Sequence, residues 1–326
     1  MTSAAAFQQG IYKFGFARRL AQWLDATPHP PLAIEITPDC IAGARWSRTG
    51  GLDGLAVQPL PPGAIVPSAV DVNMVNSSAA RSVMTSVCRQ LKTREEEEIA
   101  LLLPDTVIRV FVQHFEEFPR NPEEALPMLR WKLKKSVPFE PDETVLSYML
   151  QPPRESGVDV VTALARLRII REYEGLAEGV ALLPGVILSS SLAALSLLSA
   201  QRPTLLARVS GAALTTAIVR EGVLCGYRST ELPAHGRELT PQMLLEEIFP
   251  LAAYYQDTWS EGVQSVLLAG LGVRVAEFIQ PLESEFHCPV RSLPAATLSE
   301  GRIREDARAL ADRELDGLVG WSLHGD

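Results

Sequence analysis

Apolar and polar positions along the chain form short runs that predict a series of strands separated by helices. Leu32 to Ile36, Ile41 to Ser47 and Ile99 to Leu103 are apolar-rich runs that stop at turn residues, which is typical of buried strands. Val107 to Phe118 is rich in β-branched and aromatic residues with partial alternation, so it predicts a half-buried strand. The Pro-rich segment from Val57 to Pro67 predicts a loop.

A helix and a further strand are predicted after Asn121. This residue is a suitable N-cap, Pro122 is a suitable first helical residue, and leucines then follow at helical spacing. Pro138 ends the helix, and Thr144 to Leu150 is predicted to form the next strand. Four cations lie along this helix, Arg130, Lys132, Lys134 and Lys135, and they are better explained as a solvated helix face than as a binding patch.

The rest of the chain continues the mixture of strands and helices. Strands are predicted at 160–167, 186–188, 205–219 (two strands around Gly211), 223–229 and 263–268, and helices at about 77–92, 170–178, 189–198, 241–259, 275–286 and from 302. Residues 7–24 predict a basic amphipathic helix that docks on this protein or on a partner, with contact to acidic lipid as the alternative. No short tandem repeat is visible.

Composition narrows the class of protein. A chain of 326 residues with 47% hydrophobic residues is long enough to bury more than one core, so two or more domains are expected. A net charge of −9 argues against nucleic acid as a partner. The four cysteines are far apart with no CxxC pair, and no cleavable leader is seen, so a cytoplasmic location is expected. The uncharged stretch 179–200 is broken by Pro184-Gly185 and by Ser189 to Ser191, which predict a helix cap rather than a membrane span.

Common catalytic and metal-binding patterns are missing from the sequence. It contains no GxSxG, P-loop or HExxH motif, and its five histidines do not show zinc-ligand spacing. We therefore predict neither catalytic residues nor a metal site, and we expect no efficient ATP hydrolysis.

Five short motifs of the sequence resemble motifs of the type IV pilus assembly protein PilM family. They are Leu103-Pro104-Asp105, Glu117-Phe118-Pro119, Leu129-Arg130-Trp131-Lys132, Val137-Pro138-Phe139 and Ser147-Tyr148. The resemblance implies an α/β actin-like ATPase fold, with two lobes and a small α+β subdomain inserted in the first lobe. The implied division is an N-terminal amphipathic segment at 1–30, a first lobe at 31–98, 176–203 and 302–326, an inserted subdomain at 99–175, and a second lobe at 204–301.

In that family a first glycine hairpin approaches the nucleotide phosphates, with a nearby acid for magnesium. The matching segment here runs from Glu35 to Ala42. Glu35 keeps a carboxylate, but Thr37 replaces the glycine and Pro38 removes a backbone donor. If ATP binds, Glu35 and Asp39 are the expected metal-side carboxylates.

The second and third nucleotide motifs differ in how well they match. Arg208 replaces the aspartate of the second hairpin and is followed by Ser210 and Gly211; its cation can pair with a phosphate but cannot ligate magnesium. The adenine-side turn is kept better, with candidate residues Ala269, Gly270 and Gly272. We therefore expect weak or absent ATP binding and no required cofactor, with ATP and magnesium left open as the alternative.

The resemblance also implies a function and partners. It points to a non-catalytic cytoplasmic scaffold of a type IV pilus machine, peripheral at the inner face of the inner membrane. Such a scaffold docks the cytoplasmic tail of a PilN-like membrane protein, associates with itself into a ring, and contacts the membrane indirectly or through its N-terminal segment. Pro138 and Phe139 are candidate partner-binding residues, although core packing is the better explanation for them. The alternatives are an ATP-binding actin-like ATPase and a GspL-like type II secretion component.

Overall fold

The computed structural model describes residues 29–47, 49–140, 143–154, 156–198, 201–232 and 239–323. The amphipathic helix predicted at 7–24 lies outside these residues. Within them, no helix is long and apolar enough to cross a membrane.

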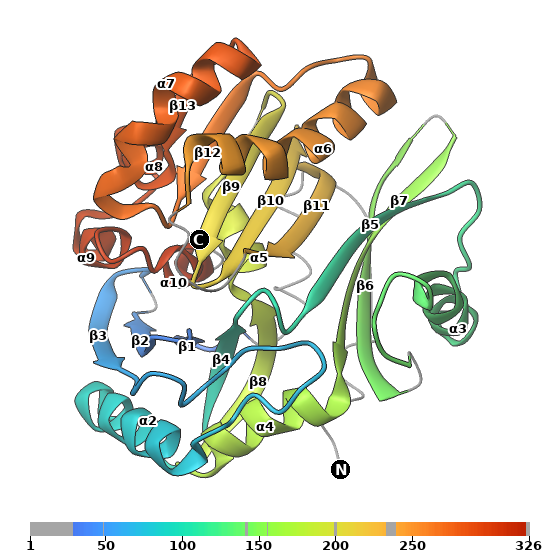
Figure 1. Ribbon diagram of the computed structural model, residues 1–326. Helices are drawn as coiled ribbons and strands as arrows, with labels where there is room; N and C mark the ends of the chain where they lie inside the picture. Colours follow the sequence, from blue (N-terminus) through green and yellow to red (C-terminus); the bar gives the residue numbers. More distant parts are fainter. Residues whose placement is uncertain are drawn as a thin grey trace.

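Two five-stranded sheets with the same strand plan form the two lobes (Figure 1). In each sheet three consecutive strands form an antiparallel meander, and the first of these also pairs in parallel with a later strand. The first sheet has the order β3 (Leu52–Pro59), β2 (Cys40–Trp46), β1 (Leu32–Ile36), β4 (Glu97–Leu103) and β8 (Leu182–Ser189). The second has the order β11 (Val223–Glu231), β10 (Ala213–Arg220), β9 (Thr204–Ser210), β12 (Ser265–Ala269) and β13 (Val290–Ser292).

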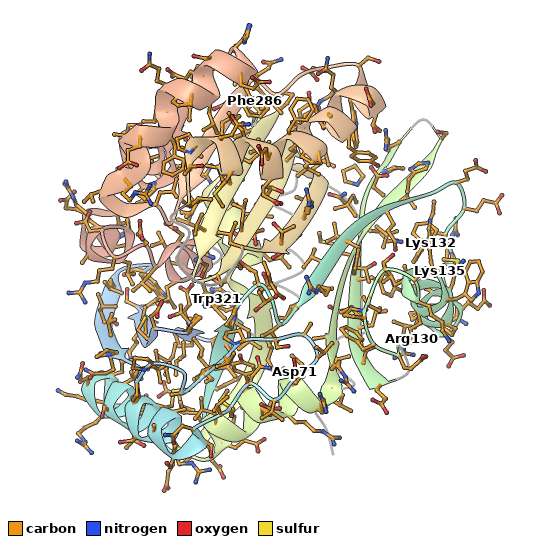
Figure 2. The ribbon with its side chains drawn as sticks, in the orientation of Figure 1. Asp71, Arg130, Lys132, Lys135, Phe286 and Trp321 are labelled. Carbon is orange, nitrogen blue, oxygen red and sulfur yellow. The ribbon has the colours of Figure 1, made fainter. Side chains whose placement is uncertain are left out.

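The helices follow from the apolar spacing of the sequence. Helices α2 (Ser77–Leu91) and α4 (Leu167–Glu178) pack on the first sheet, and α6 (Pro241–Trp259) and α7 (Val275–Phe286) pack on the second. The remaining helical segments are α5 (Ser190–Ala194), η3 (Leu195–Leu197), η4 (Gly272–Arg274), α8 (Leu293–Ser299), η5 (Glu305–Ala307), α9 (Arg308–Ala311) and α10 (Asp316–Ser322). Although it follows the second lobe in sequence, α10 returns to the first lobe, where Trp321 is part of the core (Figure 2).

A third, smaller sheet is inserted in the first lobe. It has the order β5 (Arg109–Phe115), β7 (Gly157–Arg166) and β6 (Thr144–Arg154), with α3 (Pro122–Leu133) packed on one face (Figure 1). The insert occupies the crossover that leads from β4 through α4 to β8. The corresponding crossover of the second lobe, from β12 through α7 to β13, is short. This pattern confirms the fold class expected from the sequence, two lobes with a subdomain inserted in the first.

The structure differs from the sequence predictions at several boundaries. The insert was expected to span 99–175, but β4 pairs with β1 and β8, and α4 packs against β8, so the third sheet spans only 109–166. The loop expected from Val57 begins later, because β3 continues to Pro59, which lies opposite Cys40 at the end of the pairing. The short strand β13 and helix α8 were not predicted.

Candidate functional site: an ion cluster between the lobes

The centre of the site is a glutamate at the carboxyl end of the middle strand of the first lobe. Glu35 is the fourth residue of β1 and is fully buried. Its carboxylate accepts hydrogen bonds from the Arg208 Nη2 at 3.2 Å, from the Leu318 backbone N–H at 3.3 Å and from the Ser190 hydroxyl. A buried carboxylate requires such donors, because burial removes its hydration.

The partner cation comes from the equivalent strand of the second lobe. Arg208 lies on β9, the first strand of its own meander, and only 2% of it is exposed. Besides Glu35, its Nη1 donates to the Ser191 hydroxyl at 3.1 Å and lies 3.5 Å from the Asp105 carboxylate. Burial lowers the pKa of the Arg208 guanidinium, but the surrounding carboxylates raise it by more, so the group stays charged.

Asp105 joins this cluster from the turn after β4. It accepts hydrogen bonds from the Ser189 and Ser191 hydroxyls, both at 2.5 Å, and from the Ser191 backbone N–H at 3.0 Å. The Ser189 hydroxyl also accepts from the Leu192 backbone N–H, so it caps α5 as the sequence predicted. The serines therefore cap a helix and also hold a buried carboxylate.

Asp316 completes the cluster from the first turn of α10. It is buried, and its Oδ2 lies 3.6 Å from the Arg208 Nε; neither atom has a hydrogen-bond partner within the described part of the chain. Burial raises the pKa of Asp316 to about 6, with Glu35 adding to the rise and Arg208 opposing it. We call Glu35, Asp105, Arg208, Asp316 and the three serines 189–191 the interlobe cluster. It holds three carboxyl groups and one guanidinium.

Close backbone packing seals the interlobe cluster. A Cβ added to Gly211, which has φ +57°, would lie 3.1 Å from Pro38 Cγ, so the turns that join β1 to β2 and β9 to β10 touch each other. At Gly317 an added Cβ would lie 2.6 Å from the Ser190 hydroxyl, and at Gly320 it would lie 2.1 Å from the Ala193 carbonyl. Because these glycines have no side chain, α10 can lie directly against α5 and enclose the cluster.

The structure brings together only part of the predicted nucleotide site. Glu35 and Arg208 meet, but Arg208 pairs with carboxylates instead of the phosphate that its charge suggested. The Thr37 hydroxyl accepts from the Cys40 backbone N–H at 3.0 Å within its own turn, and Asp39 is exposed, away from the cluster. Ser210 and Gly211 lie at the β9–β10 turn.

The adenine-side turn contacts protein groups. Ala269 is buried opposite Arg208 in the β9–β12 register. Gly270, with φ +73°, lies so close to the Val209 carbonyl that an added Cβ would be 1.7 Å from its oxygen. Gly272 donates its backbone N–H to the Glu314 carboxylate, so an acidic side chain occupies this glycine turn.

Sequence reasoning missed Asp105, Asp316 and the second role of Ser189 to Ser191. Asp105 was named only as part of the Leu103-Pro104-Asp105 motif, yet its position directly after a buried strand could have marked it as a site residue. Asp316 gave no local signal. The two partner-binding candidates lie before β6, where Pro138 is exposed and Phe139 is half-buried; neither belongs to a core cluster of the described residues, so core packing does not explain them.

The chemistry of the interlobe cluster does not fit a magnesium nucleotide. The one cation, Arg208, is already surrounded by three carboxyl groups, so a phosphate entering the cluster would add negative charge where negative charge is in excess. The carboxylates that would ligate magnesium instead accept hydrogen bonds from serines, a backbone N–H and Arg208. In the described residues, no group of three or more His, Cys, Asp or Glu side chains is arranged to hold a metal ion.

Comparison with known proteins identifies the fold. No family model and no curated protein matches the sequence. The structure is similar to that of the PilM-PilN type IV pilus biogenesis complex, with a TM-score of 0.69 and 17% identity over 91% of this chain and 99% of that chain. Two further matches are a Bacteroides thetaiotaomicron protein with an actin-like ATPase fold (TM-score 0.48, 11% identity, 90% of this chain and 100% of that chain) and the cytoplasmic domain of Vibrio cholerae EpsL, an inner membrane component of the type II secretion system (0.45, 13%, 73% and 80%). The chain therefore has the PilM-like form of the actin-like fold, as its sequence motifs predicted.

Proposed function

We propose that this chain is a non-catalytic, nucleotide-independent scaffold of a type IV pilus machine. It docks on the cytoplasmic tail of a PilN-like membrane protein at the inner face of the inner membrane, and it associates with itself into a ring. The fold it shares with PilM of the PilM-PilN complex supports the choice of machine and partner. The proposed nucleotide independence rests on the interlobe cluster, in which Arg208 is already paired with carboxylates.

In this proposal Arg208 replaces the bound nucleotide as the link between the lobes. Its guanidinium comes from the second lobe and contacts Glu35, Asp105 and Asp316, which all lie on first-lobe elements. A charge-assisted contact of this kind supplies within the chain what a metal and phosphates supply between two lobes. The lobes then stay closed without a ligand, which suits a scaffold whose shape must be constant.

The partner tail is proposed to bind where the first lobe meets the insert. Strand β6 pairs with β7 along one edge, and within the described residues its other edge has no strand partner. The first-lobe loop 60–76 is tied to the insert because Arg166, the last residue of β7, donates to the Val70 carbonyl at 3.1 Å. That loop exposes Val66, Val72 and Val75, and β6 exposes Val145. An unpaired strand edge near exposed valines suits an extended apolar peptide.

Nucleotide independence is tested by titrating the full chain with fluorescent ATP, with and without magnesium, and following anisotropy. We expect no saturable binding at high micromolar protein. An actin-like ATPase measured in parallel shows that the probe is active. Saturable binding displaced by unlabelled ATP would contradict the proposal, and nucleotide would then be a candidate switch for docking.

Docking is tested with a synthetic peptide of the cytoplasmic tail of a PilN-like protein from the same organism. We expect a Val145→Glu variant to bind the peptide about tenfold more weakly, since a charge on the strand edge opposes burial of an apolar tail. Val273→Glu is the matched control, because Val273 is almost fully exposed on the second lobe. Equal binding by the two variants would exclude this surface, and no binding by the wild-type chain would exclude the partner.

A further inference from the structure

Helix α3 presents an aromatic and basic face away from the protein. Its buried side is made of Ala125, Leu129 and Leu133, whereas Pro127 and Trp131 lie on the opposite side, and Lys134 and Lys135 follow in the turn directly after the helix. The exposed acids Glu123 and Glu124 lie in the first turn, at the other end of the helix from the lysines. Trp131 is 78% exposed, which is unusual for this residue type. The lysines have a local explanation at the carboxyl end of a helix, where the dipole favours cations, but Trp131 has none. Figure 2 shows Lys132 on this helix and Lys135 just after it, at the outer side of the insert.

Helix α6 presents an aromatic and acidic face on the second lobe. Its buried side includes Leu244, Ile248, Leu251 and Tyr255. The opposite side exposes two aromatic rings, Phe249 at 53% and Tyr254 at 54%, together with Pro250. Glu246 and Asp257 flank the rings, both are exposed, and α6 contains no lysine or arginine. The two faces are therefore alike in aromatic character and opposite in charge.

The two faces cannot meet within one copy of the chain. Helix α3 packs on the face of the small sheet that carries Leu146, Tyr148 and Leu150. The second lobe lies against the other side of this sheet, where Gln151 exchanges hydrogen bonds with the backbone of Leu224, and β5 packs against β11. The small sheet thus separates α3 from α6, as Figure 1 shows.

We infer that the α3 face of one copy docks on the α6 face of a second copy. Trp131 would contact the exposed rings of α6, and the positive charge of Lys134 and Lys135 would lie over the acidic face that carries Glu246 and Asp257. Lys134 pairs with Glu140 at 3.3 Å within its own chain. Because both side chains are exposed, this ion pair is weak, and Lys134 can leave it for an acid of a second copy at little cost. The contact joins different surfaces of identical chains, so it is heterologous and generates a ring if the rotation closes and a filament if it does not.

The inference gives the self-association in the proposed function a structural basis. Each ring contact and each exposed ion pair changes an association constant by about twofold to tenfold. The expected association is therefore weak and salt-sensitive, and it is strengthened when membrane partners hold several copies together. It requires neither the partner tail nor nucleotide, so it can fail while the docking proposal stands.

The test is sedimentation velocity of the full chain over a concentration series, in about 50 mM and about 500 mM salt. One variant carries Lys134→Glu and Lys135→Glu on α3, and a second carries Glu246→Lys and Asp257→Lys on α6. The control carries Arg89→Glu and Arg171→Glu, two exposed positions on α2 and α4 that change the net charge as the α3 variant does. Thermal melts of all variants check that the fold is unchanged.

We expect the wild type and the control to associate at low salt, and each interface variant to associate at least about tenfold more weakly. Mixing the two interface variants should restore association, because the reversed α3 face of one then matches the reversed α6 face of the other. Trp131→Ala should weaken association without changing the salt dependence. The inference is overturned if the wild type stays monomeric or if the mixture fails to associate. It is also overturned if Trp131→Ala associates as the wild type does and loses only binding to anionic lipid vesicles.

Discussion

Replacing Arg208 by alanine should destabilise the protein strongly, because it removes the cation shared by three buried carboxyl groups. Glu35 and Asp105 would be left without a counter-charge, and breaking a buried ion pair from one side costs about 3–5 kcal/mol. Native stabilities are about 5–15 kcal/mol, so this loss is a large share of the total. For a chain of this size, at about 2 °C per kcal/mol, the melting temperature should fall by about 6–10 °C.

A chemical rescue separates charge from packing at this position. Alanine leaves space where free guanidinium can enter, so about 20 mM guanidinium chloride should recover part of the stability of Arg208→Ala, compared with sodium chloride at the same ionic strength. Arg208→Met fills most of the space without charge and should not respond. The assay is thermal and urea unfolding of the three proteins in both salts.

Two results would refute this account of the interlobe cluster. One is an Arg208→Ala protein within about 1 kcal/mol of the wild type, since a buried charge shared by three carboxyl groups cannot be that dispensable. The other is an additive double-mutant cycle between Arg208→Met and Glu35→Gln. Groups 3.2 Å apart in one network should couple by at least about 0.5 kcal/mol.

The remaining predictions concern protonation and backbone packing. The folded-state pKa of Asp316, raised to about 6, lies above its unfolded value, so stability should fall as pH rises from about 4 to about 6 and then level off. Asp316→Asn should remove this loss and be the more stable protein at pH 8 in urea titrations, with exposed Asp312→Asn unchanged from the wild type. Gly270→Ala should cost more than about 2 kcal/mol by the same assay, because its Cβ would overlap the Val209 carbonyl. Gly63→Ala, also at positive φ but with no atom within 4 Å of its Cβ, should cost only about 1 kcal/mol.

The sequence predicts most of the strands because their apolar runs and turn residues are local signals. The two strands around Gly211 and the helix that begins at Pro122 appear as expected, the helix with the Asn121 side chain accepting from the Glu123 backbone N–H at 3.0 Å. Strand β3 was missed because glycine and proline weaken the strand pattern at both of its ends. The repeated strand plan of the two lobes is a property of pairing, and the residues that pair show no repeat in sequence.

The candidate site was predicted only where local motifs mark it. Glu35 and Arg208 were found because each occupies a hairpin position of the family pattern, Glu35 with the expected carboxylate and Arg208 in place of the expected aspartate. Their joining could not be predicted, since 172 positions separate them and only the packing of the lobes brings them together. Asp316 lies on a short helix, not on a hairpin, and no sequence motif marks it. The adenine-side glycines were identified correctly as a turn, but their contacts with Val209 and Glu314 depend on tertiary structure.

The return of α10 to the first lobe affects the order in which the protein can fold. The first-lobe core includes Leu318, Val319 and Trp321, and the Trp321 indole donates to the Pro30 carbonyl beside β1. The 126 residues between Ser189 and Asp316 must therefore be made after β8 before this core can close. At about 5–20 residues per second, that interval is roughly 6–25 s of synthesis. Throughout this interval the Glu35 carboxylate lacks its covering helix, although Arg208 is made early in it. The nascent first lobe is therefore a natural substrate for chaperones, whereas the second lobe is continuous in sequence and can fold as it emerges.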